Sequence, residues 1–98
     1  MADDDALLVQ RSLDGDEVAL RALIERFQQI VFSVCYRMLG QREDAEDIAQ
    51  DSLLRMIRKL DQWDPARPLT PWVLTIAANR CRTFLEKRSR RPVASDLV

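Results

Sequence analysis

Histidine is absent from this chain of 98 residues, and cysteine occurs only twice, as Cys35 and Cys81. Because zinc sites normally draw four clustered ligands from these residue types, we expect neither a metal site nor another cofactor. Histidine is also the side chain most often used in general acid–base catalysis, so we expect that the chain is not an enzyme. Both cysteines lie among apolar residues, where a thiol usually behaves as a small core side chain.

The sequence also lacks any apolar run approaching the roughly 20 residues that a membrane-spanning helix needs. Its N-terminus, Met1-Ala2-Asp3-Asp4-Asp5, is acidic, whereas a secretory signal carries positive charge ahead of an apolar stretch. We therefore expect a cytoplasmic protein with no membrane partner.

Net charge is close to zero, at −1, but the charges are unevenly distributed along the chain. Residues 1–64 contain 14 acidic and 8 basic side chains, a net of −6, whereas residues 65–98 contain 2 and 7, a net of +5. This asymmetry indicates two surfaces with different partners, although uneven solvated faces are also common in helical proteins. The negative total predicts weak binding to duplex DNA, because non-specific binding is largely electrostatic.

Glycine is as scarce as cysteine, and Gly15 and Gly40 both lie where a helix would end. No segment alternates polar and apolar residues as a half-buried strand does. We therefore predict an all-α fold, a compact bundle of about four helices with a long loop between the third and the fourth. The expected helices cover about residues 4–12, 17–39, 43–60 and 70–88.

Two helix starts are marked by capping residues. Asp16 can cap the second helix, and Thr70 can cap the fourth with Pro71 at its first position, where the missing N–H costs nothing. Apolar residues at spacings of three and four then define the core. They are Leu7, Leu8 and Val9; Leu20, Leu23, Ile24, Phe27, Ile30, Val31, Val34, Cys35 and Met38; Ala45, Ile48, Ala49, Leu53, Met56, Ile57 and Leu60; and Val73, Ile76, Ala77 and Phe84.

The outer face of the third helix is acidic and contains one exposed leucine. Single exposed leucines are ordinary, and spacing alone favours that interpretation. A leucine surrounded by carboxylates also has the composition of a small docking site for a basic partner. The residues of this face are Asp47, Gln50, Asp51, Leu54 and Arg58, with Asp44 beside them.

The predicted loop, Trp63-Asp64-Pro65-Ala66-Arg67-Pro68-Leu69-Thr70-Pro71-Trp72, is rich in proline and has a tryptophan at each end. Each proline fixes its own φ and favours an extended conformation in the preceding residue, so the loop is stiff. A stiff loop with aromatic side chains suits the capture of an unstacked base. Tryptophans at helix ends more often seal a core, and we assign Trp63 to that role first.

The fourth helix has a polar face followed by a basic C-terminal turn. Asparagine and arginine on an exposed helix are among the side chains that bind base edges, and a basic run can position phosphates. Basic residues near a helix C-terminus also stabilise the helix dipole. We expect the Arg80 stem to be buried, with its head in solvent or paired with an acid. The polar face and basic turn are Trp72, Thr75, Asn79, Arg82, Thr83, Glu86, Lys87 and Arg88.

The order of these pieces resembles a known family. The string Leu39-Gly40-Gln41-Arg42-Glu43-Asp44-Ala45-Glu46-Asp47-Ile48-Ala49-Gln50-Asp51 resembles the region-two pattern of extracytoplasmic-function (ECF) sigma factors. Downstream, Trp72-Val73-Leu74-Thr75-Ile76-Ala77-Ala78-Asn79-Arg80 resembles the "W-L-x-x-I-A-x-N" helix of the same family. The resemblance covers roughly residues 10–91, with both motifs on predicted helices.

This resemblance implies a transcription initiation factor domain that docks on core RNA polymerase and recognises and melts the −10 promoter element. The third helix would bind the clamp helices of the largest subunit, and the loop and fourth helix would bind the single-stranded non-template strand. The implied polymerase-binding residues are Asp44, Asp47, Gln50, Asp51, Leu54 and Arg58. The implied DNA-binding residues are Arg67, Trp72, Thr75, Asn79, Arg80, Arg82, Thr83, Lys87 and Arg88.

The chain departs from the family pattern at two positions of the fourth helix. Family members commonly carry an acid where this chain has Thr83 and a base where it has Glu86, which leaves the preferred −10 sequence open. We expect Arg82, one turn from Glu86, to neutralise its charge.

We predict that the domain covers residues 1–91 and that residues 92–98 begin an interdomain linker or a disordered tail. An anti-sigma factor is a further partner that the resemblance implies. The alternative function is a protein-interaction module on the same helical scaffold, which binds polymerase or a regulator without opening DNA.

Overall fold

The computed structural model describes residues 2–90, and within this range it contains helices and no strand. The all-α prediction is therefore confirmed. The elements are α1 (Ala2–Leu13), α2 (Glu17–Leu39), α3 (Arg42–Arg58), a short 3₁₀ helix η1 (Leu60–Gln62) and α4 (Leu69–Arg90). The predicted domain end at residue 91 and the predicted linker 92–98 lie outside the described residues.

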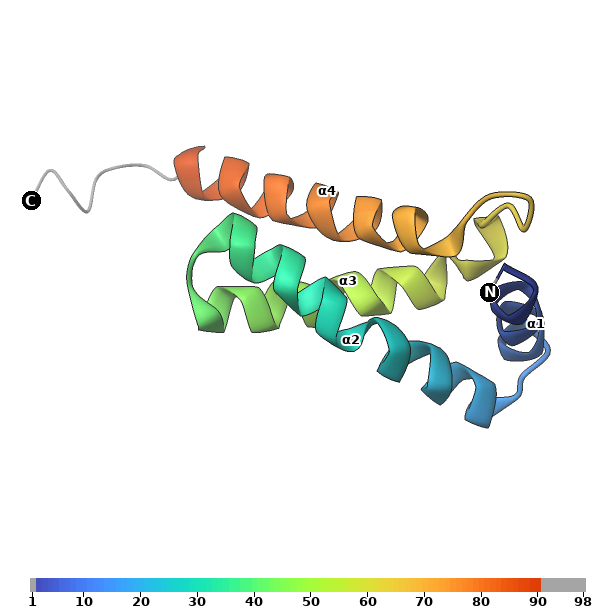
Figure 1. The fold of residues 1–98 in the computed structure, drawn as a ribbon. Helices are drawn as coiled ribbons and strands as arrows, with labels where there is room; N and C mark the ends of the chain where they lie inside the picture. The colour runs from blue at the N-terminus through green and yellow to red at the C-terminus, as the bar shows by residue number, and fades with distance from the viewer. Residues whose placement is uncertain (1, 91–98) are drawn as a thin grey trace, which may run out of the picture.

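The three long helices, α2, α3 and α4, pack against one another, and α1 crosses one end of the bundle (Figure 1). At that end α1 lies beside η1 and the loop that leads into α4. At the opposite end, the turn between α2 and α3 lies beside the last turns of α4. The bundle therefore has two ends of different construction, and α4 runs along the whole length between them.

Both ends of α2 are fixed by the residues that the sequence marked. The Asp16 side chain accepts hydrogen bonds from the backbone N–H groups of Val18 and Ala19, at 3.0 and 3.2 Å. Gly40 ends the helix with φ +77°, and its N–H donates to the Tyr36 carbonyl at 2.9 Å. Left-handed backbone at this position favours glycine, so the chain can turn directly into α3.

The start of α4 differs from the prediction. The helix begins at Leu69, so Thr70 lies inside the first turn and is not the cap, and Pro71 occupies the third helical position. Proline is still accommodated, because the first four N–H groups of a helix have no partner within it. The irregular stretch is also shorter than expected, since α3 ends at Arg58 and η1 adds one more turn before Trp63.

The core is a continuous stripe of buried residues from all the helices. Leu23, Phe27, Val31 and Cys35 follow one another at four-residue spacing along α2, each at most 2% exposed. Trp63 is buried beneath the loop, as its predicted role in sealing the core requires. The remaining buried apolar residues are Val9, Ala19, Leu39, Ala45, Ile48, Ala49, Leu53, Met56, Leu60, Leu69, Val73, Ala77 and Cys81.

Two predicted core residues, Leu7 and Ile30, are exposed instead, at 52% and 39%. Neighbouring residues in a helix point about 100° apart, so an apolar run cannot turn every side chain inward. In α1 the buried position is Val9, with Leu8 half-buried, and in α2 it is Val31.

A charged pair attaches α1 to the bundle. The Asp5 carboxylate, whose side chain is 11% exposed, pairs with Arg26 Nη1 of α2. A buried carboxylate is costly unless it is paired, so this contact fixes where α1 crosses α2.

Among the described helices, none has a stretch long and apolar enough to cross a membrane.

Candidate docking face and nucleic-acid interface

The outer face of α3 agrees with the spacing prediction at four of its five residues, and Asp51 differs. Asp47, Gln50, Leu54 and Arg58 are exposed, and Leu54 is 49% accessible to solvent. A half-exposed leucine flanked by an acid and an amide can give a basic helix one apolar contact and a polar rim. The other two predicted residues of this face, Asp44 and Asp51, are only partly exposed and lie toward α4.

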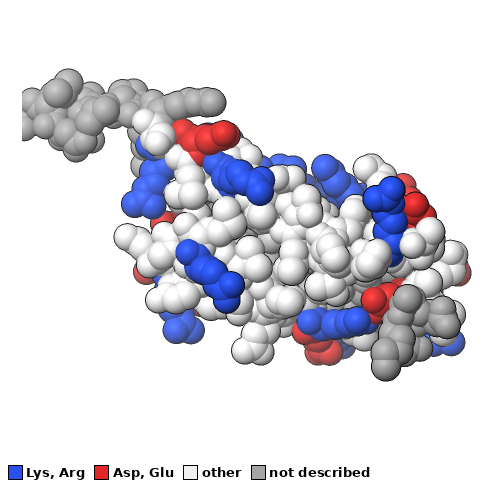
Figure 2. Space-filling view, turned by 45° about the horizontal axis from the view of Figure 1, so that its top comes forward, with Lys and Arg blue, Asp and Glu red and all other residues white. Residues whose placement is uncertain are grey.

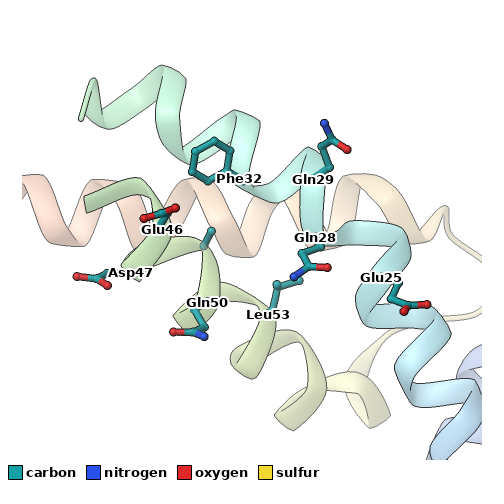
Figure 3. A pocket seen from close by; sticks show the side chains of 9 residues that line it. Glu25, Gln28, Gln29, Phe32, Glu46, Asp47, Gln50 and Leu53 are labelled. Atoms are coloured by element: carbon teal, nitrogen blue, oxygen red, sulfur yellow. The ribbon is translucent and has the colours of Figure 1, made fainter. Parts of the chain in front are cut away.

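A cavity of about 720 Å³ lies next to this face, between α2 and α3 (Figure 3). Leu53 and the ring of Phe32 supply its apolar surface, and Figure 3 shows Gln28 of α2 reaching toward Leu53. The residues that line it are Glu25, Gln28, Gln29, Phe32, Glu46, Asp47, Ala49, Gln50 and Leu53.

The contribution of α2 to this cavity was missed in the sequence. Glu25, Gln28, Gln29 and Phe32 have helical spacing and a mixed polar character, which is the signal that would have pointed to them. Their side chains extend the acidic α3 face into a groove with carboxylates on both sides, from Glu25 on one helix and from Glu46 and Asp47 on the other.

The proline-rich loop and α4 enclose a second cavity, of about 450 Å³. Asp64 shapes the loop: its carboxylate accepts the Ala66 N–H at 2.9 Å, and its carbonyl accepts the Arg67 N–H, also at 2.9 Å. Trp63 forms a buried wall, and its indole N–H makes no hydrogen bond to a described residue. The lining residues are Gln62, Trp63, Asp64, Arg67, Pro68, Pro71, Trp72 and Thr75. Three predicted DNA-binding residues, Arg67, Trp72 and Thr75, are thus brought together.

Farther along α4, the polar face is held by local hydrogen bonds. Arg82 Nη1 donates to Asn79 Oδ1 at 2.6 Å, and the Thr83 hydroxyl donates to the Asn79 carbonyl at 3.0 Å. Arg82 is thereby directed toward Asn79, and no ion pair between Arg82 and Glu86 is present in the described part of the chain. The expected neutralisation of Glu86 by Arg82 is therefore not observed.

Basic side chains are scattered over the face shown in Figure 2, several of them beside acidic ones, and they do not merge into one continuous patch. Lys87 and Arg88 lie at the C-terminal part of α4, where they face the turn between α2 and α3 across a cavity that also touches Gln41, Asp44 and Phe84. Dispersed basic residues suit contacts to individual phosphates of a strand that lies along α4.

Two ion pairs cross from α3 to α4 among the side chains that the structure describes. Arg80 Nε donates to Asp51 Oδ2 at 2.6 Å, which identifies the acid that the buried Arg80 stem was expected to meet. Arg88 Nη1 lies 3.5 Å from Asp44 Oδ2. Each pair joins a residue predicted to bind polymerase to one predicted to bind DNA.

The two cysteines are free and buried in the core. Burial first, and then a hydrogen bond and charge interaction with Cys81, raise the pKa of the Cys35 thiol to about 12, against an opposing hydrogen bond with Ser52. The Ser52 side chain, which the sequence interpretation did not assign to the core, is 2% exposed and donates to the Ile48 carbonyl at 2.7 Å. Cys35 is therefore a protonated packing residue.

The structure is thus an all-helical domain in its described part, with an acidic outer face on α3 and an aromatic cavity beside the basic helix α4. A family model for sigma-70 region 2 matches residues 23–91, which is more than half of the chain. An engineered region 2 of sigmaE, solved by NMR in complex with GTAAAA, superimposes with a TM-score of 0.80 at 32% identity, covering 89% of this chain and 90% of that one. The chain belongs to the sigma-70 region 2 family, within its ECF group.

Curated relatives agree with this assignment. The ECF RNA polymerase sigma factor SigG of Mycobacterium tuberculosis is 38% identical over 73 residues, which cover 74% of this chain and 20% of SigG. The ECF RNA polymerase sigma-E factor of Escherichia coli is 31% identical over 93 residues, which cover 95% of this chain and 48% of that protein. The chain thus spans half or less of the length of these relatives.

Proposed function

We propose that this domain docks on core RNA polymerase through α3 and binds the unpaired non-template strand of the −10 promoter element through α4 and the preceding loop. The observation that carries the proposal is the match to a region 2 of sigmaE bound to GTAAAA, which extends over 90% of that chain. The cavity between Trp63 and Trp72 lies on the loop and helix that would meet the strand.

The proposed docking face consists of the exposed side chains of α3. Asp47 and Gln50 also line the groove against α2, so a partner helix placed on Leu54 can meet both surfaces. Carboxylates around an apolar contact favour a basic partner and raise its association rate. We propose the clamp helices of the largest polymerase subunit as that partner, with Asp44, Asp51 and Arg58 at the edge of the contact.

The proposed DNA site is built around the cavity of the loop. A volume of about 450 Å³ with aromatic walls can hold one unstacked base, and stacking on an aromatic side chain contributes roughly 1–3 kcal/mol per base. That gain is comparable to the cost of flipping a base out of the stack, which is a few kcal/mol. Asn79 lies one to two turns beyond the cavity residues of α4, where it can read the edge of a neighbouring base. Arg82 and Thr83 lie beside it.

Separate basic residues, and not one continuous basic patch, would position the strand. Arg67 at the cavity and Lys87 and Arg88 near the end of α4 mark the two ends of a path along the helix. Phosphate contacts fix the register of the strand, and the cavity and Asn79 supply the sequence preference.

We propose that the domain directs RNA polymerase and is not itself an enzyme, since its relatives are sigma factors. It would act in the cytoplasm with the polymerase. An anti-sigma factor is a further proposed partner, because many ECF sigma factors are held inactive by one, although no residue of this chain identifies it.

The experiment that tests the proposal is binding of labelled domain to core RNA polymerase, with the paired variant Asp47→Arg, Leu54→Arg. We expect wild-type binding and its loss in the variant, with an unchanged helical circular dichroism spectrum in both. Absence of binding by the folded wild-type domain would contradict the proposal. Polymerase binding without any affinity for single-stranded DNA would favour the interaction module.

A further inference from the structure

Asp51 and Arg80 form the shorter of the two ion pairs between the described residues of α3 and α4. Arg80 Nε lies 2.6 Å from Asp51 Oδ2, and the Arg80 side chain is only 21% exposed, against 37% for Asp51. Charge-assisted hydrogen bonds of this length are about twice as strong as neutral ones. The carboxylate therefore determines where the guanidinium of Arg80 lies.

Arg80 uses only its Nε atom in this contact, so the two terminal nitrogens of its guanidinium remain free. Arginine carries five N–H donors in a planar fork, and Asp51 engages the single donor on Nε. Neither terminal nitrogen of Arg80 bonds to another described residue, and neither is among the buried polar atoms without a partner, so both reach solvent. With Nε held from the α3 side, the two terminal nitrogens form the outward edge of the fork.

A second arginine holds the carboxylate itself. Arg55, one turn farther along α3, places its Nε 3.4 Å from the same Oδ2 atom of Asp51. This Nε is buried and lacks the alignment of a hydrogen bond, so its interaction with Asp51 is that of an ion pair. One carboxylate thus lies between two guanidinium groups, which fixes it in position on the α4 side of its helix.

We propose that Asp51 is a positioning residue for DNA binding: it orients the Arg80 guanidinium so that its terminal nitrogens can contact a phosphate of the −10 strand beside Asn79. This inference rests on the proposed function, and it gives a residue of the polymerase-binding helix a role in the DNA site. A guanidinium that is already oriented loses less side-chain entropy on binding than a free one.

For removal of the Asp51 carboxylate, orientation of Arg80 and long-range electrostatics predict opposite changes in DNA affinity. Removal of the Asp51 carboxylate makes the domain more positive by one charge, and long-range attraction alone would then tighten binding to a polyanion. Loss of the Arg80 orientation, in contrast, weakens the binding of the domain to DNA. Asp61 provides a matched control, because it is exposed, lies outside both proposed binding surfaces and makes no ion pair with a described residue.

The test measures binding of the full chain to a fluorescent single-stranded oligonucleotide that contains GTAAAA, and to a mixed-sequence pool of single-stranded 12-mers. We expect Asp51→Ala and Arg80→Ala each to bind about threefold to tenfold more weakly than wild type, and the double variant to be no weaker than either. Asp61→Ala should bind equally well or more tightly. Thermal unfolding of each variant shows whether the binding change occurs in a folded domain.

Each outcome has a separate meaning. Equal or tighter binding by folded Asp51→Ala, as for Asp61→Ala, overturns the inference while the proposed function stands. Additive losses in the double variant also overturn it, because the two residues would then act independently. A wild-type domain that binds neither probe at low salt removes the proposed DNA site, and the inference falls with it. An Asp51→Ala domain that is unfolded is replaced by Asp51→Asn, which must still bind more weakly than Asp61→Asn.

Discussion

Trp63 and Trp72 line one cavity from different parts of the chain, and of the two only Trp63 is buried. Trp63 follows η1 and belongs to the core, whereas Trp72 lies in the first turns of α4 and is half-buried. The same cavity thus joins a structural tryptophan to one that is available to a ligand, and substitutions at the two positions should have different effects.

Replacement of Trp72 by alanine should reduce single-strand binding, and it should destabilise the fold less than Trp63→Ala because Trp72 is only half-buried against the core. Loss of one stacking partner is expected to cost about 1–3 kcal/mol, or roughly 5- to 150-fold in Kd. Fluorescence anisotropy with a GTAAAA-containing strand measures the affinity, and Trp72→Phe should retain much of it because an aromatic face remains. An unchanged Kd for Trp72→Ala would exclude the cavity as a base site.

Trp63→Ala should instead destabilise the fold. Truncation of a buried tryptophan to alanine typically costs about 3–5 kcal/mol, from lost burial and the cavity left behind. Trp63→Phe should cost much less, since the buried indole N–H has no described partner whose hydrogen bond would be lost. Urea unfolding followed by circular dichroism gives both values, and equal losses for the two variants would contradict this role.

The pair between Asp5 and Arg26 should stabilise the attachment of α1. Asp5→Ala is expected to cost about 1–2 kcal/mol, which lowers Tm by roughly 4–8 °C for each kcal/mol in a domain of this size. Asp61→Ala is the control, because the Asp61 carboxylate makes no ion pair with a described residue. Its Tm should lie within about 2 °C of the wild-type value. A Tm for Asp5→Ala as high as that of the control would show that the pair contributes no stability.

Stability should fall at alkaline pH partly because of Cys35. Its pKa is raised from 9.0 to about 12 in the folded chain, so the native state retains a proton that the unfolded state loses. The stabilising contribution is complete below pH 9 and is lost progressively between pH 9 and 12. Urea unfolding at pH 8 and pH 10 should show a smaller decrease for Cys35→Ala than for wild type. An identical decrease in both would contradict the assignment.

Much of the fold could be predicted because local chemistry determines it. The carboxylate of Asp16 and the backbone freedom of Gly40 define the ends of α2 without help from distant residues. Leu7 and Ile30 were assigned wrongly because apolar character does not tell which of several neighbouring side chains faces the bundle. That choice depends on how far each helix is rotated about its axis when it packs.

The candidate site was predictable in composition and less so in its contacts. The exposure of Leu54 and the burial of the Arg80 stem followed from helical spacing. The partner of Arg80 did not, because Asp51 is 29 residues away and meets it only through the packing of α3 on α4. The groove between α2 and α3 arises in the same way, since neither helix alone encloses it.

The most direct test of the central claim is a selection of single-stranded DNA from a random pool by this domain, alone and bound to core RNA polymerase. We predict that the domain enriches one short motif, that Trp72→Ala abolishes the enrichment, and that a duplex pool gives none. Equal recovery of all single-stranded sequences, or enrichment that persists in Trp72→Ala, would contradict the claim that this domain reads an unpaired −10 element.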